Sequence, residues 1–267
     1  MALRRKQLQV AHAYEQVSAE IEAQILDGVL QPGEQLPGEL ELATLFGVNR
    51  STVREGIRRL ESEGLVRRSS PRRLVVSLPR AADLATRQTR ALRLMEVTFL
   101  ELWETAMSTE PLAAELAARH ADAAALAALR DNQRQLERTA GAGESPVALD
   151  TEFHNLVAAC SGNRVLQLAR EPVGFLLYSG LETLLPHLPQ APERQIEAHR
   201  RVIEAIACRD PATARLWMRR HTQDFRRGFE LAGLPLDVSI VTLAKRGAAA
   251  RREPGPLARP LDDNSLE

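Results

Sequence analysis

The fold of the first part of the chain is decided by residues 46–66, which read FGVNRSTVREGIRRLESEGLV. Apolar side chains recur along this stretch at Val53, Ile57 and Leu60. That spacing places them on one face of a helix that begins near Arg50. Gly64 interrupts the pattern, as glycine commonly does at a helix C-terminus. We therefore predict a short amphipathic helix whose other face is rich in arginine.

Elements on both sides complete a small domain. Residues 12–28 carry apolar side chains at helical spacing, and a second short helix is expected over residues 40–46. Two strands are expected at residues 65–68 and 74–77, on either side of a turn. Three helices and a hairpin in this order are typical of the winged helix-turn-helix. We predict such a domain over residues 1–80.

The rest of the chain follows a different pattern. From residue 81 to residue 235 apolar positions keep the helical period almost throughout, and turn-forming residues interrupt it at intervals. We expect an antiparallel bundle of six or seven helices there, so the fold class is mainly α. Residues 236–267 lack this periodicity and contain several Gly, Ala and Pro residues, and we predict a disordered tail.

Charge is distributed unevenly along the chain. Its 267 residues include 35 basic and 35 acidic side chains, yet residues 47–80 carry nine arginines against three glutamates. Such a basic cluster indicates an anionic partner for one end of the chain. We find no apolar run long enough to span a membrane, no signal peptide, and only two cysteines, too few for a disulfide framework. We expect a cytoplasmic protein.

The polar face of the arginine-rich helix suits the major groove of DNA. Its first turns carry four hydrogen-bonding side chains, namely Arg50, Ser51, Thr52 and Arg54. A recognition helix contacts base edges with its N-terminal residues. Arginine pairs with two acceptors of guanine, and serine or threonine reaches a phosphate or a base. We predict that these residues bind double-stranded DNA.

Four side chains in the second region have the spacing of a metal site. Asp150 and His154 are four residues apart and share one face of a predicted helix. His199 and His221 each lie 11 residues from Asp210, so an antiparallel helix pair that turns there places both imidazoles at one depth. Three imidazoles and one carboxylate suit a divalent metal. Spacing alone leaves a second interpretation open, in which the histidines are hydrogen-bonded core residues.

Three motifs near the N-terminus occur in a characteristic order: Leu36-Pro-Gly-Glu39, residues 46–55 and residues 60–66. Together they resemble the N-terminal domain of GntR-family bacterial transcriptional regulators. The resemblance covers about residues 12–77 and implies a winged helix-turn-helix that binds operator DNA, with the wing tip in the adjacent minor groove. The DNA contacts that it implies on the recognition helix are Arg50, Thr52 and Arg54.

Two positions depart from the pattern of that family. Leu40 stands where many members have an arginine that contacts DNA. The wing tip, residues 69–73, reads Ser-Ser-Pro-Arg-Arg where many members have a glycine, and Pro71 stiffens the turn. Arg72 and Arg73 remain candidates to enter a narrow minor groove. We therefore expect an operator preference that differs from that of relatives.

A second group of motifs lies in the helical region: Asp150-Thr-Glu-Phe-His154, Glu197-Ala-His199 and Arg220-His221. They resemble the ligand-binding FCD domain of the FadR-type branch of the GntR family, over about residues 83–232. In metal-binding members the matching positions hold zinc or another divalent ion. The resemblance implies zinc, with nickel or manganese as alternatives, and its ligands here are Asp150, His154, His199 and His221.

The same resemblance implies a pocket for a small-molecule effector beside the metal. Many relatives carry an arginine four residues before a glutamate, and it faces a carboxylate of the effector. Glu110 matches that glutamate, and Ala106 takes the place of the arginine. We expect a bulkier or more apolar organic acid, with these side chains as candidate walls: Trp103, Met107, Phe175 and Tyr178.

These observations favour a ligand-responsive transcriptional regulator. We expect a repressor that binds a near-palindromic operator as a homodimer, because one such domain makes few contacts with DNA. Two alternatives stay open: a constitutive DNA-binding protein whose helical body only dimerises, and a metal-dependent enzyme with a DNA-binding appendage. No general base or oxyanion donor is identifiable beside the metal ligands, so no catalytic residue is expected.

Overall fold

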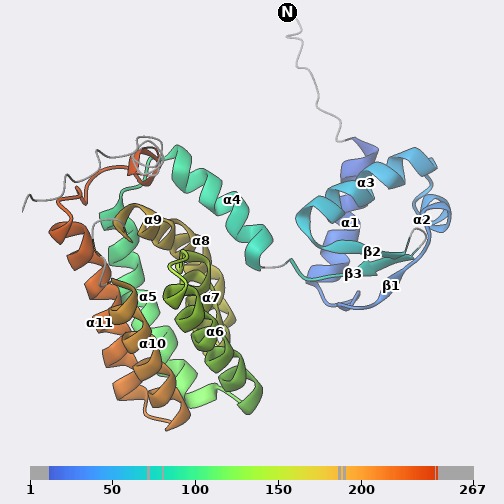
Figure 1. The fold of residues 1–267 in the computed structure, drawn as a ribbon. Helices are drawn as coiled ribbons and strands as arrows, with labels where there is room; N and C mark the ends of the chain where they lie inside the picture. Colours follow the sequence, from blue (N-terminus) through green and yellow to red (C-terminus); the bar gives the residue numbers. More distant parts are fainter. Residues whose placement is uncertain are drawn as a thin grey trace, which may run out of the picture. The chain divides into compact units, whose positions relative to one another are not determined.

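The computed structural model describes residues 12–70, 73–79, 81–185, 188, 191–243 and 245. The chain divides into two compact units, Met1–Leu84 and Ala85–Glu267. The division falls four residues beyond position 80, where the sequence pattern changes. The order of the elements in each unit can be followed in Figure 1.

The first unit contains three helices and a small antiparallel sheet. The helices are α1 (Ala13–Leu26), α2 (Glu39–Phe46) and α3 (Arg50–Glu63). The strands are β1 (Gln35–Leu36), β2 (Val66–Ser70) and β3 (Arg73–Val76), in the order β1-β3-β2. The predicted winged helix-turn-helix is confirmed. The short strand β1 was not predicted, because two residues are too few to show an alternating pattern.

Local sequence sets both ends of α3. The side chain of Asn49 caps its N-terminus by accepting a hydrogen bond from the backbone N–H of Thr52 at 2.8 Å. Gly64 follows its last turn with φ of +79°, a conformation that favours glycine. Three side chains of the helix are fully buried in the core of the unit: Val53, Ile57 and Leu60. Burial of this face leaves the arginine-bearing face of α3 exposed.

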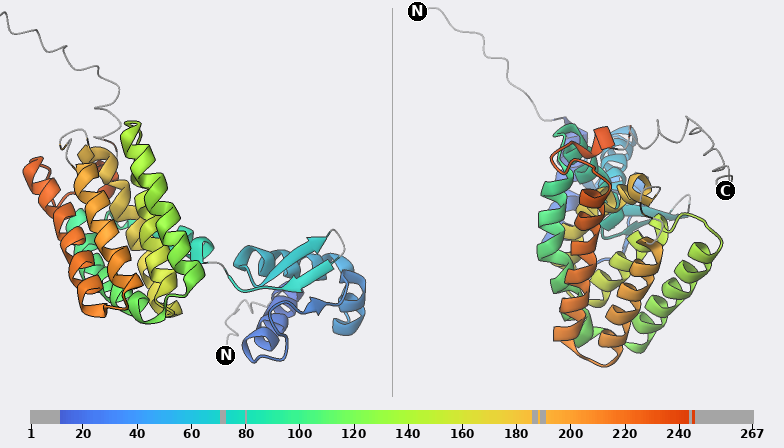
Figure 2. Two further views of the ribbon diagram at one scale, coloured as in Figure 1. Left: turned by 60° about the horizontal axis from the view of Figure 1, so that its bottom comes forward. Right: turned by 60° about the vertical axis from the view of Figure 1, so that its left-hand side comes forward.

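The second unit is a helical bundle. Its elements are α4 (Ala81–Leu94), which begins before the division between the units, α5 (Phe99–His120), α6 (Ala123–Gly141), α7 (Val147–Cys160), α8 (Arg164–Ser179), α9 (Leu181–Leu184), α10 (Ala191–Ala207) and α11 (Pro211–Leu231). Helix α5 packs against α7, α8, α10 and α11, and the long helices lie side by side (Figure 2). Among the described residues α4–α11 make eight helices, one more than the six or seven expected, and the predicted mainly α bundle is confirmed.

The segment after α11 corrects one prediction. Residues 236–243 pack onto the start of α5, where Ile240 donates a backbone hydrogen bond to Val97 and Leu243 is fully buried. The prediction of a disordered tail from residue 236 is wrong for this segment. Its apolar residues alternate irregularly. Sequence periodicity therefore does not reveal that the bundle surface at the start of α5 buries them. Residues 244 and 246–267 lie outside the described residues.

Candidate metal centre and nucleic-acid interface

Four side chains from three helices meet inside the bundle. Asp150 and His154 lie on α7, His199 on α10 and His221 on α11. One ligand atom from each lies within 4.8 Å of all the others. The first three side chains are buried, whereas that of His221 is 12% exposed. The packing of the helices therefore assembles the four residues that were selected by spacing.

The distances between these atoms suit a single ion. His221 Nε2 lies 3.2 Å from Nε2 of both His154 and His199, and His199 Nε2 lies 3.2 Å from Asp150 Oδ1. Asp150 Oδ1 lies 3.7 Å from His221 Nε2 and 4.0 Å from His154 Nε2. Ligand atoms about 2.0–2.1 Å from one zinc ion lie roughly 3.3 Å apart in a tetrahedron. The distances given above, from 3.2 to 4.0 Å, include that value.

Glu110 sets the orientation of His154. The Nδ1 atom of His154 lies 2.8 Å from Glu110 Oε2, and an ionised carboxylate only accepts, so Nδ1 carries the proton. The Nε2 lone pair of His154 then faces the cluster. Arg170 donates from Nε to Glu110 Oε1 at 2.8 Å. Burial alone would raise the pKa of Glu110, but Arg170 and His154 outweigh burial and lower this pKa to about 2. The carboxylate thus acts as the outer partner that metal-binding histidines commonly have.

Two buried polar atoms of the cluster have no hydrogen-bond partner within the described part of the chain, namely Asp150 Oδ2 and His199 Nδ1. Burial would raise the pKa of Asp150, but its hydrogen bonds with His199 and His221 hold that pKa well below its usual range. Burial lowers the pKa of His199 to about 3. An ionised carboxylate among three imidazoles, with a carboxylate oxygen left over, is a donor set that fits a divalent cation.

Aromatic side chains hold the imidazoles in place. His199 stacks on Phe153 with ring centroids 3.6 Å apart, and His154 stacks on Tyr178 with centroids 4.2 Å apart. Phe153 belongs to one apolar cluster of the bundle and Tyr178 to the other. The site therefore lies where the two cores meet, and its ligands have little freedom to rotate.

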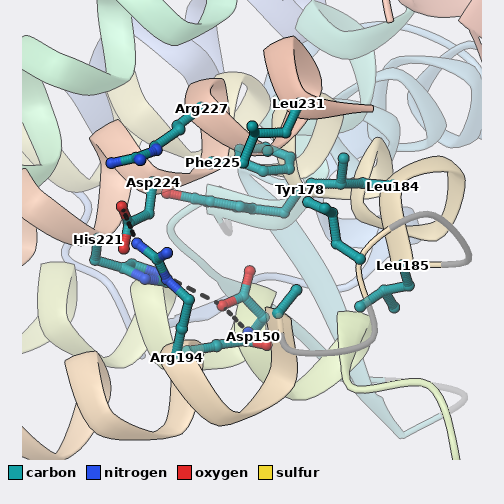
Figure 3. Close-up of a pocket in the computed structure, with 14 residues that line it drawn as sticks. Asp150, Tyr178, Leu184, Leu185, Arg194, His221, Asp224, Phe225, Arg227 and Leu231 are labelled. Carbon is teal, nitrogen blue, oxygen red and sulfur yellow. Dashed lines mark hydrogen bonds and ion pairs between the residues drawn. The ribbon is translucent and has the colours of Figure 1, made fainter. Parts of the chain in front are cut away.

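A cavity opens beside the cluster. Asp150 and His221 line it, together with Tyr178. Figure 3 shows the polar side chains Asp150, His221 and Arg194 gathered on one side of this cavity and Leu184 and Leu185 on another. Its empty volume is about 690 Å³, which includes open solvent at its mouth. Because the cavity is open to solvent, a solute can reach the polar side chains that line it.

Most of the expected effector-pocket walls lie elsewhere. Of the four aromatic and methionine residues proposed, Tyr178 lines the cavity, whereas Trp103, Met107 and Phe175 do not. Phe175 is 56% exposed, and the Trp103 indole donates to the backbone carbonyl of Thr222. The expectation for these three is wrong for this cavity. Residue type alone does not show which side of a helix faces an internal space.

Most of the predicted DNA-reading residues are exposed on the first unit. Arg50, Ser51 and Arg54 are exposed, and the Ser51 and Thr52 hydroxyls both donate to Asn49 Oδ1, at 2.6 and 2.9 Å. Arg73 is exposed at the start of β3, and Arg72 lies outside the described residues. The N-terminal turn of α3 thus presents hydrogen-bonding groups to solvent, as a recognition helix requires.

Comparison with protein families assigns both units. Residues 13–76 match the model for bacterial regulatory proteins of the gntR family, and residues 101–224 match the FCD domain. The chain belongs to the GntR family. Its FCD domain places it in the FadR-type branch, so this GntR-family chain is a DNA-binding transcriptional regulator.

Similar proteins agree with this assignment. The chain is 29% identical over 232 residues to the HTH-type transcriptional repressor NanR of Salmonella newport and to that of Salmonella typhi. The match covers 80% of this chain and 84% or 82% of those proteins. The structure of Streptococcus agalactiae GntR is similar, with a TM-score of 0.60 and 27% identity, over 80% of this chain and 99% of that chain. These relatives are transcriptional regulators of the GntR family and not enzymes.

Among the described residues, every helix is too short or too polar to cross a bilayer.

Two residues of the site in this GntR-family chain were not selected from the sequence. Arg170 supports Glu110, and Gln195 donates from Nε2 to Asp150 Oδ1. A signal for Arg170 existed, because it stands four residues after Leu166 and seven before Leu177, in the buried register of α8. A charge at such a position indicates a buried partner. Gln195 has no comparable signal.

Proposed function

We propose that this chain is a ligand-responsive repressor that binds a near-palindromic operator as a homodimer and releases it when a small organic acid enters the bundle. One observation carries the proposal. Asp150 and His221 belong to the four-residue cluster and also line the cavity beside it. A molecule in that cavity therefore reaches the cluster directly.

A divalent metal is part of this proposal, with zinc as the first candidate and nickel or manganese as alternatives. The residues that would hold it are Asp150, His154, His199 and His221. When bound, the ion supplies a Lewis-acid site for an oxygen atom of the effector. The two orphaned atoms of the cluster and the carboxylate behind His154 support this assignment.

The walls of the cavity favour an acid with an apolar body. Among its described lining residues the apolar members include Leu184, Leu185, Leu188, Phe225 and Leu231. The hydroxyl of Tyr178 lies 3.2 Å from His154 Nδ1 and hydrogen-bonds with Glu110, so it is already engaged. Arg227, at the exposed rim, makes no ion pair with any described residue. We infer that an anionic group of the effector meets the metal or Arg227 while its hydrocarbon part contacts the leucines.

On the DNA side, α3 is the proposed recognition helix, with Arg50, Thr52 and Arg54 as its contacts and Arg73 at the wing. An effector that binds one arrangement of the bundle more tightly shifts the population toward that arrangement. A coupling of about 1–3 kcal/mol changes operator affinity roughly 5- to 150-fold. The repressors named among the relatives support loss of DNA binding as the response.

The test combines metal analysis with DNA binding. The full-length chain is analysed for bound metal, and its affinity for a duplex selected from a random library is measured with straight-chain acids from acetate to octanoate and with gluconate. We expect one divalent ion per chain and stronger release by the longer acids than by acetate or gluconate.

The matched variant for this test is His199→Ala. We expect it to lose the metal and the response to acids while keeping its affinity for the duplex. If the wild-type chain binds the duplex without stoichiometric metal and no acid changes the affinity, the chain is a constitutive DNA-binding protein and the effector proposal is wrong.

A further inference from the structure

One carboxylate in the first unit contacts three guanidinium groups. Oε2 of Glu39, the first residue of α2, lies 3.2 Å from Arg50 Nε and 3.4 Å from Arg54 Nε. Its Oε1 lies 3.1 Å from Nη2 of Arg68, which belongs to strand β2 and also pairs through Nε with Glu61 at 3.0 Å. Glu39 therefore connects the recognition helix to the wing through side chains that are 11, 15 and 29 residues away in sequence.

The carboxylate lies beneath a layer of more exposed cations. The side chain of Glu39 is 12% exposed, whereas those of Arg50 and Arg54 are 60% and 44% exposed. Burial alone would raise the pKa of Glu39, but Arg68, Arg50 and Arg54 outweigh burial and keep this pKa below its usual value. The group is therefore an anion at neutral pH, and it stays fixed while the outer ends of the arginines face solvent.

The contacts with Glu39 leave the terminal nitrogens of Arg50 and Arg54 available for reading bases. Glu39 contacts both helix arginines through Nε, on the side of the guanidinium group. Recognition of guanine requires two parallel N–H donors of one guanidinium, and the terminal nitrogens at its end are not used in these contacts. Anchoring at Nε removes rotamers of a long side chain before DNA arrives, which lowers the entropic cost of binding.

We infer that Glu39 is a specificity-determining positioning residue, which holds Arg50 and Arg54 in one orientation and draws Arg68 into the same DNA-facing surface. The inference rests on the proposed assignment of α3 as the recognition helix. The negative charge of Glu39 has two opposite effects on DNA affinity. It weakens attraction to phosphates of any sequence, and it strengthens binding to the one sequence that matches the ordered guanidinium groups.

The test compares two duplexes. One is selected from a random library by the wild-type full-length chain, and the other is a shuffled duplex of the same length and composition. We expect Glu39→Gln to bind the shuffled duplex more tightly, because one negative charge is lost near the phosphates. It binds the selected duplex more weakly, and the ratio of the two affinities falls about tenfold or more.

Glu41→Gln is the matched control, because it removes the same charge from an exposed position of α2. It shifts both affinities alike and keeps their ratio. If Glu39→Gln also keeps the wild-type ratio while Arg54→Ala loses it, the inference about Glu39 is overturned and α3 remains the recognition helix. If Arg54→Ala keeps the ratio too, the assignment of α3 fails as well.

A second variant separates positioning from folding. Glu39→Asp keeps the charge but shortens the side chain by one methylene group, so the carboxylate no longer reaches all three arginines. We expect its affinity for the shuffled duplex to equal that of the wild type while the ratio falls. Should Glu39→Gln fail to fold, as judged by its thermal unfolding, the ratio measured for Glu39→Asp decides the question, and an unchanged ratio overturns the inference.

Discussion

At the scale of single residues, the ion pair of Glu110 and Arg170 stands out because both side chains are 1% exposed. Charged groups tolerate such burial only when they are paired and hydrogen-bonded. Arg170 Nη1 donates to Asn155 Oδ1 at 2.6 Å, and Gly174 leaves room for the guanidinium where a Cβ atom would collide with Nη2. The pair therefore depends on several elements at once, and it holds the proton of His154 on Nδ1.

A first prediction concerns this pair. Glu110→Gln leaves the buried Arg170 without a counter-charge, so we expect the free energy of unfolding to fall by about 3–5 kcal/mol. Urea unfolding of the full-length chain measures the change. Glu104→Gln, at an exposed position of the same helix, serves as the control and changes stability by less than about 0.5 kcal/mol. Equal behaviour of the two variants would contradict the role of the pair.

A second prediction concerns pH in chelator-treated protein. The pKa of His199 is about 3 in the folded chain and near 6.5 in the unfolded chain. Below pH 6.5 the unfolded chain binds a proton that the folded chain does not, so stability falls as pH falls. The expected slope from this residue is about 1.4 kcal/mol per pH unit.

The measurement is urea unfolding of the wild type and of His199→Gln between pH 7 and pH 5. The variant lacks the titrating imidazole, so its stability should depend less steeply on pH, by about one proton. Parallel pH dependence of the two proteins would show that His199 is not buried in its neutral form.

At the scale of elements, the end of the described chain stabilises the start of α5. Ser239 forms an antiparallel bridge with Thr98, and the backbone N–H of Leu100 donates to Leu236. Thr98 also caps α5 by accepting from the backbone N–H of Glu101 at 3.2 Å. The cap and the bridge therefore meet at one point, and the segment after α11 joins the core of the bundle.

A third prediction tests this contact. Leu243→Ala removes a fully buried side chain of the second apolar cluster, so we expect a loss of about 2–5 kcal/mol in unfolding free energy. Thr242→Ala changes an exposed neighbour and should cost less than about 0.5 kcal/mol. Thermal unfolding of both variants gives the comparison, and a Leu243→Ala midpoint equal to that of the wild type would contradict the packing.

At the scale of the whole molecule, the two units carry separate tasks. The proposed DNA-reading residues all belong to the first unit, and all four candidate metal ligands belong to the second. A ligand that binds only the folded form of one unit stabilises that unit, by about 2.7 kcal/mol at a concentration 100 times its Kd. The metal should therefore act on one unit and leave the local stability of the other unchanged.

A fourth prediction follows for hydrogen exchange. Addition of zinc to chelator-treated protein should slow amide exchange in residues 101–224 and leave residues 13–76 unaffected. His154→Ala removes one of the ligands and should abolish the effect. Slower exchange confined to the first unit would place the metal elsewhere in the molecule.

Features that depend on neighbours along the chain could be predicted from the amino-acid sequence alone. The helical period and its interruptions predicted the winged domain and the bundle, and glycine at position 64 marked the end of α3. Spacing selected four residues as candidate metal ligands, because helices repeat every 3.6 residues and residues equally far from the turn of an antiparallel helix pair lie at the same depth. Spacing alone still left open that the histidines are hydrogen-bonded core residues.

Contacts between side chains of separate elements depend on how those elements pack. Arg170 reaches Glu110 across 60 residues, Arg68 reaches Glu39 across 29, and Leu243 finds its place beside α5. The walls of the cavity were also decided at this level, since rotation of a helix by a few tens of degrees exchanges a lining residue for an exposed one. Packing between elements sets that rotation, and local sequence periodicity does not predict it.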